Sequence, residues 1–539
     1  NQTAFIYTIG FNASSALVNL SQIPLFVAPF LGGKHGYVKT YAAIKSAYGN
    51  TLLGGKRGGG TNSILDFYDI SDKGNFTLKK GLKLPEGKDV ELRNMEALVQ
   101  TASQRGLLGQ GFLAEAMGLN EASRIKKSGT VGNAMDNASV LSAWLFNHAE
   151  QLNRQVTLMA SFNLALDSIT KGKVNNPSAA QIEEAVQMAI YDTQQTNGGT
   201  FLETAPSIAR EGIGRVAFMY KSYGLQMYYT MLKTAKTAFD SDKGRLFGPD
   251  GSPERKAAWK QLIGLHGTAL FFAGIQGLPL YGAVKLIANL FFLDDEEEDW
   301  DTIVRQHVGE GWFKGAITQF AGIDVASRMA LTGLLIQENR FNNDPSLEET
   351  IGFYAGGPAL SVANRLYRGG SDLLSSEGDI ERGIENILPA GVANAYKATF
   401  GRYADQGGIY TRRNDPIYDD MTGGELVAQA FGFPPTEYTF RQEQNGISKR
   451  IDIAVGKRRS ALHKKLYVAQ TMGDFSAERE IYDEIDKFNA RHPEAEINTK
   501  SIERSLKQHA KTSAEMYNGV TLSPLYRDAL EMIREGYKQ

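Results

Sequence analysis

The chain has 539 residues, a formal net charge of −2 and no cysteine. The near-neutral charge argues against a chain that binds nucleic acid over its whole surface, and the lack of cysteine excludes disulfides, thiol catalysis and cysteine-ligated zinc. At about 150 residues per domain the length suggests three or four domains. Frequent glycine (57 residues) with little proline (16 residues) favours helices joined by glycine-containing bends. We therefore expect an all-α chain, an extended multi-domain helical assembly protein with little or no sheet.

The first 33 residues are uncharged, and Lys34 is the first charged residue. This stretch lacks the initial methionine and the early basic residues of a secretory signal. Pro24 and Pro29 interrupt its apolar residues, and a membrane-spanning helix needs about 20 mostly apolar residues in a row, so the stretch is a poor match for a span. We expect the chain to be an interior piece of a longer or processed polypeptide.

Helical periodicity dominates from about Asp136 onward. We expect one amphipathic helix over 146–169, a second helix with Asn176 as its N-cap, and a C-terminal helix capped by Ser476. Composition divides the chain into four expected regions: 1–135, an uncharged and glycine-rich N-terminal region; 136–255, a helical domain; 256–424, an apolar helical region with an acidic run and glycine-rich joints; and 425–539, a charged C-terminal helical domain.

A second uncharged run, from Gln261 to Val284, is the best membrane candidate in the sequence. Basic residues precede this run and an acidic run at 294–299 follows it. Membrane-spanning segments carry such basic residues on their cytoplasmic flank, so the N-terminal flank of this run would be cytoplasmic. Its glycines weaken a helix in water and are tolerated better in lipid-buried bundles. The alternative is a buried hairpin in a large helical core. The candidate segment is marked by Gln261, Ala273, Gly277, Pro279, Val284 and Leu293.

The most positive segment of the chain lies between Arg441 and Lys465. It is a candidate contact for DNA, anionic lipid or a partner protein, and the alternative is a solvated helix face. We interpret the acidic run at 294–299 as a solvated face or a pairing partner for basic residues. The candidate patch consists of Arg441, Lys449, Arg450, Lys457, Arg458, Arg459, Lys464 and Lys465.

No catalytic or metal-binding motif stands out in the sequence. The seven histidines are isolated and show no H-E-x-x-H spacing, and no G-x-S-x-G nucleophile elbow occurs. A lysozyme-type transglycosylase would show a catalytic Glu followed by Ser, and the chain has no Glu-Ser dipeptide. His266 lies in an apolar run, so we expect it in the core. We expect no catalysis, no metal and no cofactor in this chain.

The N-terminal stretch "FNASSALVNLSQIPLFVAPFLGGKHG" resembles the conserved block of the large internal virion proteins of short-tailed bacteriophages, also known as PLxRFG-domain or large polyvalent proteins. In that family an Asn-Pro-Ser-Ala-like start leads to an Asn-Leu-Thr-Gln-like core and a Pro-Leu-like end. The family's proline after the first Asn is Ala13 here, and its Arg-Phe-Gly ending reads Lys34-His35-Gly36. The matching positions are Asn12, Ala16, Asn19, Leu20, Gln22, Pro24, Pro29 and Gly36.

Three further blocks are similar to the same family in order and type. Glu150 to Arg154 resembles its Glu-x-x-Asn-Arg helix, and "FMYKSYGLQMYYTML" (218–232) resembles its aromatic helix. "AGIQGLPLYG" (273–282) resembles its Ala-Gly-x-x-Gly-Leu-Pro block. The resemblance covers roughly residues 10 to 440 and fades toward the C-terminus.

The resemblance implies a structural internal core protein, also called a DNA ejection protein. Such proteins are packed in the capsid on the portal, leave ahead of the genome, and form a conduit for DNA across the host envelope. This implies a homo-oligomeric ring, other internal core proteins and the portal as partners, contact with packaged double-stranded DNA and the host inner membrane, and a lytic module elsewhere in the longer polypeptide. Two alternatives stay open: a phage-encoded cell-wall lytic enzyme segment, and a membrane-inserting pore protein.

Overall fold

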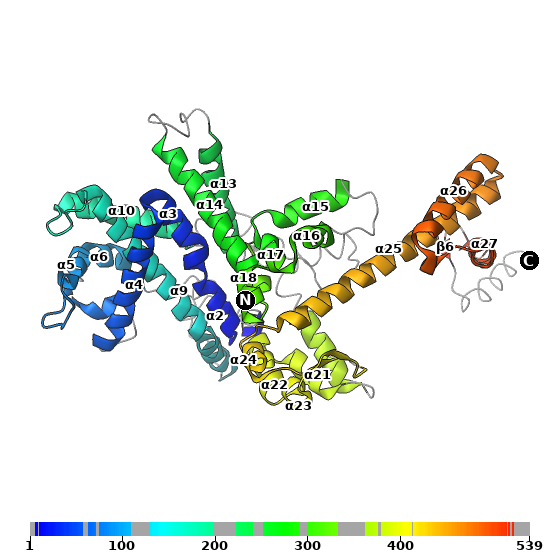
Figure 1. The fold of residues 1–539 in the computed structure, drawn as a ribbon. Coiled ribbons are helices and arrows are strands. Elements are labelled where there is room, and N and C mark those ends of the chain that lie inside the picture. The colour runs from blue at the N-terminus through cyan, green and yellow to red at the C-terminus, as the bar shows by residue number, and fades with distance from the viewer. Residues whose placement is uncertain are drawn as a thin grey trace, which may run out of the picture. The chain divides into compact units, whose positions relative to one another are not determined.

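A computed structural model gives the structure of the chain (Figure 1). It forms two compact units: unit 1 comprises Asn1–Ala288 and Asp301–Glu443, and unit 2 comprises Asn289–Trp300 and Gln444–Gln539. The four regions expected from the sequence are a finer division than these two units, and they stay predictions. The residues that the structure describes are 6–8, 10–57, 63–71, 75–108, 130–197, 222–240, 252–291, 300–331, 362–375, 379–411, 413–514, 516–517 and 520–521.

Helices make up most of the described residues, which confirms the expected all-α fold. The strands in the described part of the chain are two or three residues long and pair only as local antiparallel hairpins. These hairpins are β1 (Tyr68–Ile70) with β2 (Phe76–Leu78), β3 (Ile409–Tyr410) with β4 (Pro416–Tyr418), and β5 (Met516–Tyr517) with β6 (Val520–Thr521).

Unit 1 is already helical from Ala13, so the expectation that helices dominate only from about Asp136 is wrong. The early helices escaped notice because α2 and α3 carry no charged face before Lys34, and amphipathic periodicity is the signal that reveals a helix. The first elements of the unit are α2 (Ala13–Leu20), η1 (Ile23–Val27), α3 (Ala28–His35), α4 (Tyr37–Arg57), η2 (Ile64–Phe67), α5 (Lys88–Asn94), α6 (Glu96–Gln104), α9 (Thr130–Thr170) and α10 (Ala179–Thr196).

The largest hydrophobic core of unit 1 surrounds α9, which includes the helix expected over 146–169. Val27 and Leu31 of the N-terminal helices pack in this core together with Phe162 of α9 and Ile190 of α10. The predicted N-cap of α10 is wrong by two residues. Ser178 is the cap, because its Oγ accepts the N–H of Gln181 at 3.3 Å while the Gln181 side chain accepts the N–H of Ser178 at 2.9 Å.

A second core of unit 1 forms where η1, α13 and α14 meet, and it includes Phe26, Met231 and Leu262. A third, smaller cluster around Tyr403 and Ile409 lies near β3. The remaining elements of unit 1 are α13 (Ser222–Phe239), α14 (Pro253–Ala273), η4 (Ile275–Gly277), α15 (Tyr281–Phe291), α16 (Trp300–Val308), α17 (Glu310–Lys314), α18 (Ala316–Ala321), α19 (Ala326–Met329), α21 (Ile380–Ile387), α22 (Ala390–Thr399), α23 (Arg402–Gln406) and α24 (Gly423–Ala430), with α15 and α16 continuing into unit 2.

Unit 2 is a small helical assembly built from the second half of α25 (Thr436–Met472), α26 (Phe475–Arg491), η6 (Pro493–Ala495) and α27 (Thr499–Ala514). Leu462 and Leu466 of α25 pack against Ile485 and Phe488 of α26. The cap predicted at Ser476 is wrong: Asp474 caps α26, because its carboxylate accepts the N–H of Ala477 at 3.0 Å.

Candidate functional site

The first quoted block folds as α2, η1 and α3, one nearly continuous helical path. Asn12 caps α2 by accepting the N–H of Ser14 at 3.2 Å. Pro24 and Pro29 each lie at the first turn of a new helical segment, where a missing N–H is tolerated. Both prolines are therefore accommodated without ending the helix, and η1 is a π-helical turn between the two α-helical segments.

Ala13–His35 is the one helix among the described residues that is long and apolar enough to cross a membrane by length and composition. This differs from the expectation that prolines disqualify the stretch. However, 67% of its most apolar part lies buried inside the protein, as in the core helix of a soluble protein. In this conformation the N-terminal stretch is therefore a packing element of unit 1.

A mostly buried set of side-chain amides with one backbone carbonyl, which we call the amide junction, joins the first block to α9 and α10. It consists of Asn19, Gln22, Asn153, Thr196 and Asn197. Asn153 Nδ2 donates to Asn19 O at 2.6 Å, to Asn19 Oδ1 at 3.2 Å and to Gln22 Oε1 at 3.4 Å. Gln22 Nε2 donates to Thr196 O at 2.6 Å and to Asn197 Oδ1 at 2.8 Å. Asn153 is 1% exposed, so the junction joins segments 131 to 175 residues apart away from solvent.

A buried ion pair lies next to the amide junction on α9. Arg154 Nη2 donates to Glu150 Oε1 at 2.6 Å, and the two side chains are only 6% and 11% exposed. The pairing follows from the spacing, because residues four apart on a helix lie on the same face. Removing one partner of such a pair leaves an uncompensated buried charge and costs about 3–5 kcal/mol.

A second polar connection ties the end of α3 to α10. Lys34 Nζ lies 2.5 Å from Asp192 Oδ1, and it also lies over the ring of Phe30, 4.2 Å from the centroid. The other carboxylate oxygen of Asp192 accepts the hydroxyl of Ser161 on α9 at 2.7 Å. Lys34 lies at the end of the first block, and its charge is balanced by a carboxylate that is almost fully buried.

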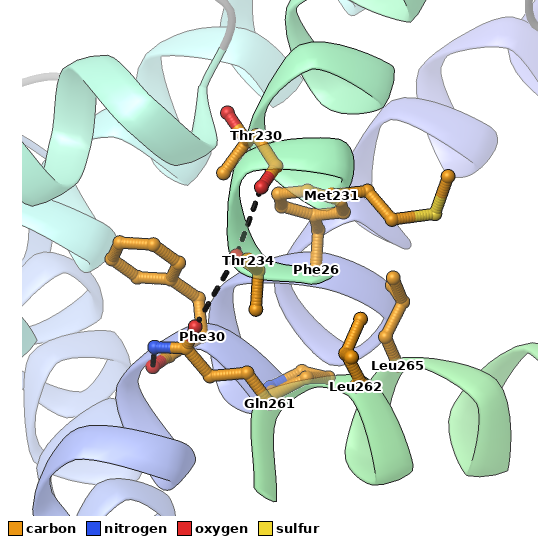
Figure 2. Close-up of a pocket in the computed structure, with 9 residues that line it drawn as sticks. Phe26, Phe30, Thr230, Met231, Thr234, Gln261, Leu262 and Leu265 are labelled. Atoms are coloured by element: carbon orange, nitrogen blue, oxygen red, sulfur yellow. Dashed lines mark hydrogen bonds between the residues drawn. The ribbon is translucent and has the colours of Figure 1, made fainter. Parts of the chain in front are cut away.

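The third block also packs against the first, beside α14 (Figure 2). Phe26 and Phe30 of the first block line a crevice with Thr230 and Met231 of the aromatic block, and Gln261 of α14 donates to the Phe30 carbonyl at 2.9 Å. The cavity volume is only about 20 Å³, enough for about one water molecule. The crevice is therefore a packing junction rather than a ligand pocket.

Glycines allow α3 and α14 to approach closely. A Cβ at Gly33 would lie 2.3 Å from Gln261 Cγ and 2.6 Å from the carbonyl oxygen of Ala257. Gly274 of the fourth block ends α14 with a φ of +68°, and a Cβ there would lie 2.4 Å from the backbone nitrogen of Gly315. These two positions have room only for glycine.

The candidate membrane segment is not one helix, because Gly274 separates α14 from η4 and α15. Ala273, Gly277 and Pro279 are buried, Gln261 is half-buried, and Leu293 lies outside the described residues. The segment nevertheless presents a row of exposed apolar side chains that are 45–67% accessible: Ile263, Phe271, Leu280, Val284 and Ile287. It therefore contributes some apolar side chains to the core and exposes others to solvent.

The charges that flank this segment are only partly described. The acidic run at 294–299 lies outside the described residues. The next acid, Asp301, accepts hydrogen bonds from Lys285 Nζ at 2.7 Å and from Tyr281 Oη at 2.8 Å. Lys285 is thus paired with a carboxylate of unit 1.

All eight residues of the candidate basic patch lie on α25. Arg441 belongs to unit 1, where it donates to Glu437 at 2.8 Å and to the Ile417 carbonyl at 2.9 Å. The other seven belong to unit 2. Among these, Lys465 pairs with Glu484 at 3.0 Å, and Arg459 donates to the Glu496 carbonyl at 3.4 Å. The patch is therefore divided between the units rather than forming one surface of a single unit.

Within this positive segment, Glu443 takes part in a charge cluster that the sequence pattern did not suggest. Its carboxylate lies 2.8 Å from Arg305 Nη2 and 3.0 Å from Nζ of Lys314, whose side chain is 2% exposed. Burial opposes ionisation of Glu443, but Lys314 and Arg305 outweigh this effect and hold the pKa of Glu443 below its usual value. The sequence showed Glu443 only as one of two acids among bases, because its partners lie more than 120 residues earlier.

The described residues contain no group of three or more His, Cys, Asp or Glu side chains that could hold a metal ion. His266 is exposed, and its Nδ1 lies 2.8 Å from the Leu262 carbonyl. The expectation that it lies in the core is therefore wrong, because it is on the outward face of α14.

No protein-family model, curated protein or solved structure matches the chain.

Proposed function

We propose that the chain is a structural internal core protein of a short-tailed bacteriophage, packed in the capsid on the portal and ejected to form a conduit for DNA across the host envelope. In this proposal it forms a homo-oligomeric ring with other core proteins and contacts the host inner membrane after ejection. The chain itself has no catalytic role, and any lytic activity belongs to another part of a longer polypeptide.

The observation that carries the proposal is the contact of the first family-like block with the second and the third. The amide junction joins the first block to the Glu-x-x-Asn-Arg block, and the crevice of Figure 2 joins the first block to the aromatic helix. The fourth block begins where α14, which packs on α3, ends. Short matches that arose by chance would have no reason to meet in one part of a fold, so their contact supports a shared ancestry.

The exposed apolar face of 261–291 supports the membrane part of the proposal. Between Lys260 and Lys285 the chain has no charged residue, and five apolar side chains of 263–287 face solvent. Exposed apolar side chains grouped in this way mark surfaces that bind a partner or a membrane. The geometry favours insertion of a helical hairpin into the lipid interface over a single spanning helix, because α14 and α15 are separate elements.

Vesicle flotation of the full chain tests this face directly. The test variant is Ile263→Gln with Phe271→Gln, two outward positions on α14. The matched control is Ile380→Gln with Phe400→Gln, which are 65% and 86% exposed in the same unit. Full burial of such a side chain contributes about 1.5–3 kcal/mol, so the half-exposed test pair should weaken vesicle binding by about 2–3 kcal/mol, or roughly 30- to 150-fold.

The control variant should bind vesicles as the unsubstituted chain does. Equal loss in both variants, or no vesicle binding by the unsubstituted chain under conditions that release it from the particle, would remove the membrane role. A membrane-inserting pore protein would also bind vesicles in this test. The two functions are distinguished by purified phage particles, which contain an internal core protein and lack a pore protein.

A further inference from the structure

Unit 2 contains a basic helix face that lies outside the positive segment found in the sequence. On α27 four basic residues occur at spacings of four, three and four, which places them along one face of the helix. All four are exposed. The one acidic residue of α27, Glu503, lies beside Lys500 and Lys507 at the edge of this row, because it is three and four residues from them. We call this row the α27 basic face; it consists of Lys500, Arg504, Lys507 and Lys511.

The opposite face of α27 is already packed against the rest of unit 2. Ile502 packs on the unit 2 core, and His509 stacks on Tyr467 of α25 with ring centroids 5.5 Å apart. Ser501 Oγ lies 3.4 Å from Nε2 of His463. Residues two positions apart on a helix point in nearly opposite directions, so Arg504 and Lys511 face away from Ile502 and His509.

The α25 helix repeats this arrangement. Arg450, Lys457 and Lys464 are seven residues apart and therefore lie along one side of the helix. Lys457 and Lys464 each come two residues after a buried core residue, Val455 and Leu462, and so point away from the core.

The acidic residues of unit 2 concentrate on α26. On this helix the carboxylates outnumber the basic side chains, and Glu484 pairs with Lys465 of α25 at 3.0 Å. The acids of α26 are Glu478, Glu480, Asp483, Glu484 and Asp486. Charge in unit 2 is therefore segregated by helix, with α25 and α27 basic and α26 acidic.

We propose that unit 2 binds the phosphate backbone of duplex nucleic acid through the α27 basic face, without regard to base sequence. From Lys500 to Lys511 the helix rises about 16 Å, which exceeds the major-groove width of about 12 Å, so its basic side chains can reach phosphates on both edges of the groove. Base-stacking proteins for single strands need exposed aromatic side chains, and α27 has no Phe, Tyr or Trp. Binding flat on a lipid surface needs an apolar helix face free to insert, and that face of α27 is packed inside unit 2.

The experiment measures duplex affinity of the full chain as a function of salt. The probe is a 24-base-pair duplex of mixed sequence, followed by fluorescence anisotropy. The test variant is Arg504→Gln with Lys507→Gln. The matched control is Arg479→Gln with Lys487→Gln, an equal charge change at exposed positions of α26. Far-ultraviolet circular dichroism checks that all three proteins have the same helix content.

Each lost phosphate contact reduces the slope of log affinity against log salt by about 0.9. The test variant should therefore show a slope about 1.8 shallower than the unsubstituted chain, and the control should keep the original slope. Three results would overturn the inference: no duplex binding by the unsubstituted chain, equal weakening in both variants, or binding to phosphatidylserine vesicles or oligo-dT in preference to the duplex. The duplex-binding assay uses neither particles nor membranes. A negative result therefore overturns the inference about α27 and does not bear on the proposed membrane role, which vesicle flotation tests.

Discussion

Replacing Asn153 by Asp tests whether the amide junction holds the N-terminal block in place. The substitution keeps the shape of the side chain but replaces the Nδ2 donor, which lies 2.6 Å from Asn19 O, by an oxygen. When protonated, the introduced carboxyl still donates one hydrogen bond, and we expect a cost of about 1 kcal/mol for the lost second one. When ionised, it faces only acceptors at a position 1% exposed, so the native state raises its pKa.

The sign of the pH dependence follows from this raised pKa. A carboxyl that must stay protonated in the native state is least costly below its solution pKa of about 3.9 and becomes more costly as the pH rises. Each pH unit adds about 1.36 kcal/mol, so the penalty grows from about 1 kcal/mol at pH 4 to a ceiling of about 5 kcal/mol at pH 7.

Hydrogen exchange with mass spectrometry measures this cost locally, which is necessary because a chain of two units has no single unfolding free energy. In peptides from α2 and the middle of α9, the ratio of exchange rates between variant and parent should be roughly 5 at pH 4 and roughly 1000 or more at pH 7. Asn176→Asp, at an exposed position before α10, should leave both ratios near one. A ratio near one in the Asn153 variant, or an equal ratio at both pH values, would refute the reasoning.

Three further perturbations test other contacts in unit 1. Arg154→Met should destabilise α9 by about 3–5 kcal/mol by removing the cation 2.6 Å from Glu150. Adding Glu150→Gln should recover most of this loss, as measured by hydrogen exchange of α9 peptides. Gly33→Ala should cost about 1–3 kcal/mol because its Cβ meets α14. In the control Gly49→Ala, the added Cβ has no neighbour within 4 Å, so this substitution should stabilise by about 0.5–1 kcal/mol. Equal effects of the two substitutions would contradict the close packing of α3 on α14. The pKa of Glu443 is held low, so the start of α25 should lose exchange protection as the pH falls below about 4.3, and Glu443→Gln should be less protected at pH 7 and show no such loss.

The sequence was sufficient to predict an all-α fold, because charge periodicity over residues 146–169 and after 425 reveals amphipathic helices. It did not reveal α2 and α3, whose uncharged residues show no polar face, nor that Pro24 and Pro29 are accommodated at the first turns of helical segments. The caps at Ser178 and Asp474 were each missed by two residues, because several polar residues near a helix start compete for the same N–H groups.

The candidate site, too, was predicted only in part from the sequence. The positions Asn19, Gln22 and Glu150 stood out by resemblance, but their contacts with Asn153 and Thr196 depend on tertiary packing that sequence spacing does not encode. The α27 basic face escaped notice because its charges are spread over a whole helix instead of forming a dense run. Periodicity of charge, read in the same way as periodicity of apolar residues, is the signal that reveals such a face.

The most direct test of the proposed function is to follow the chain in phage particles before and after genome release. Electron cryo-microscopy and mass spectrometry of purified particles should find multiple copies of the chain inside the capsid around the portal, and particles triggered to eject their DNA should have lost them. A chain that is absent from full particles, or that stays in the capsid after the genome has left, would contradict the proposal that it is an ejected internal core protein.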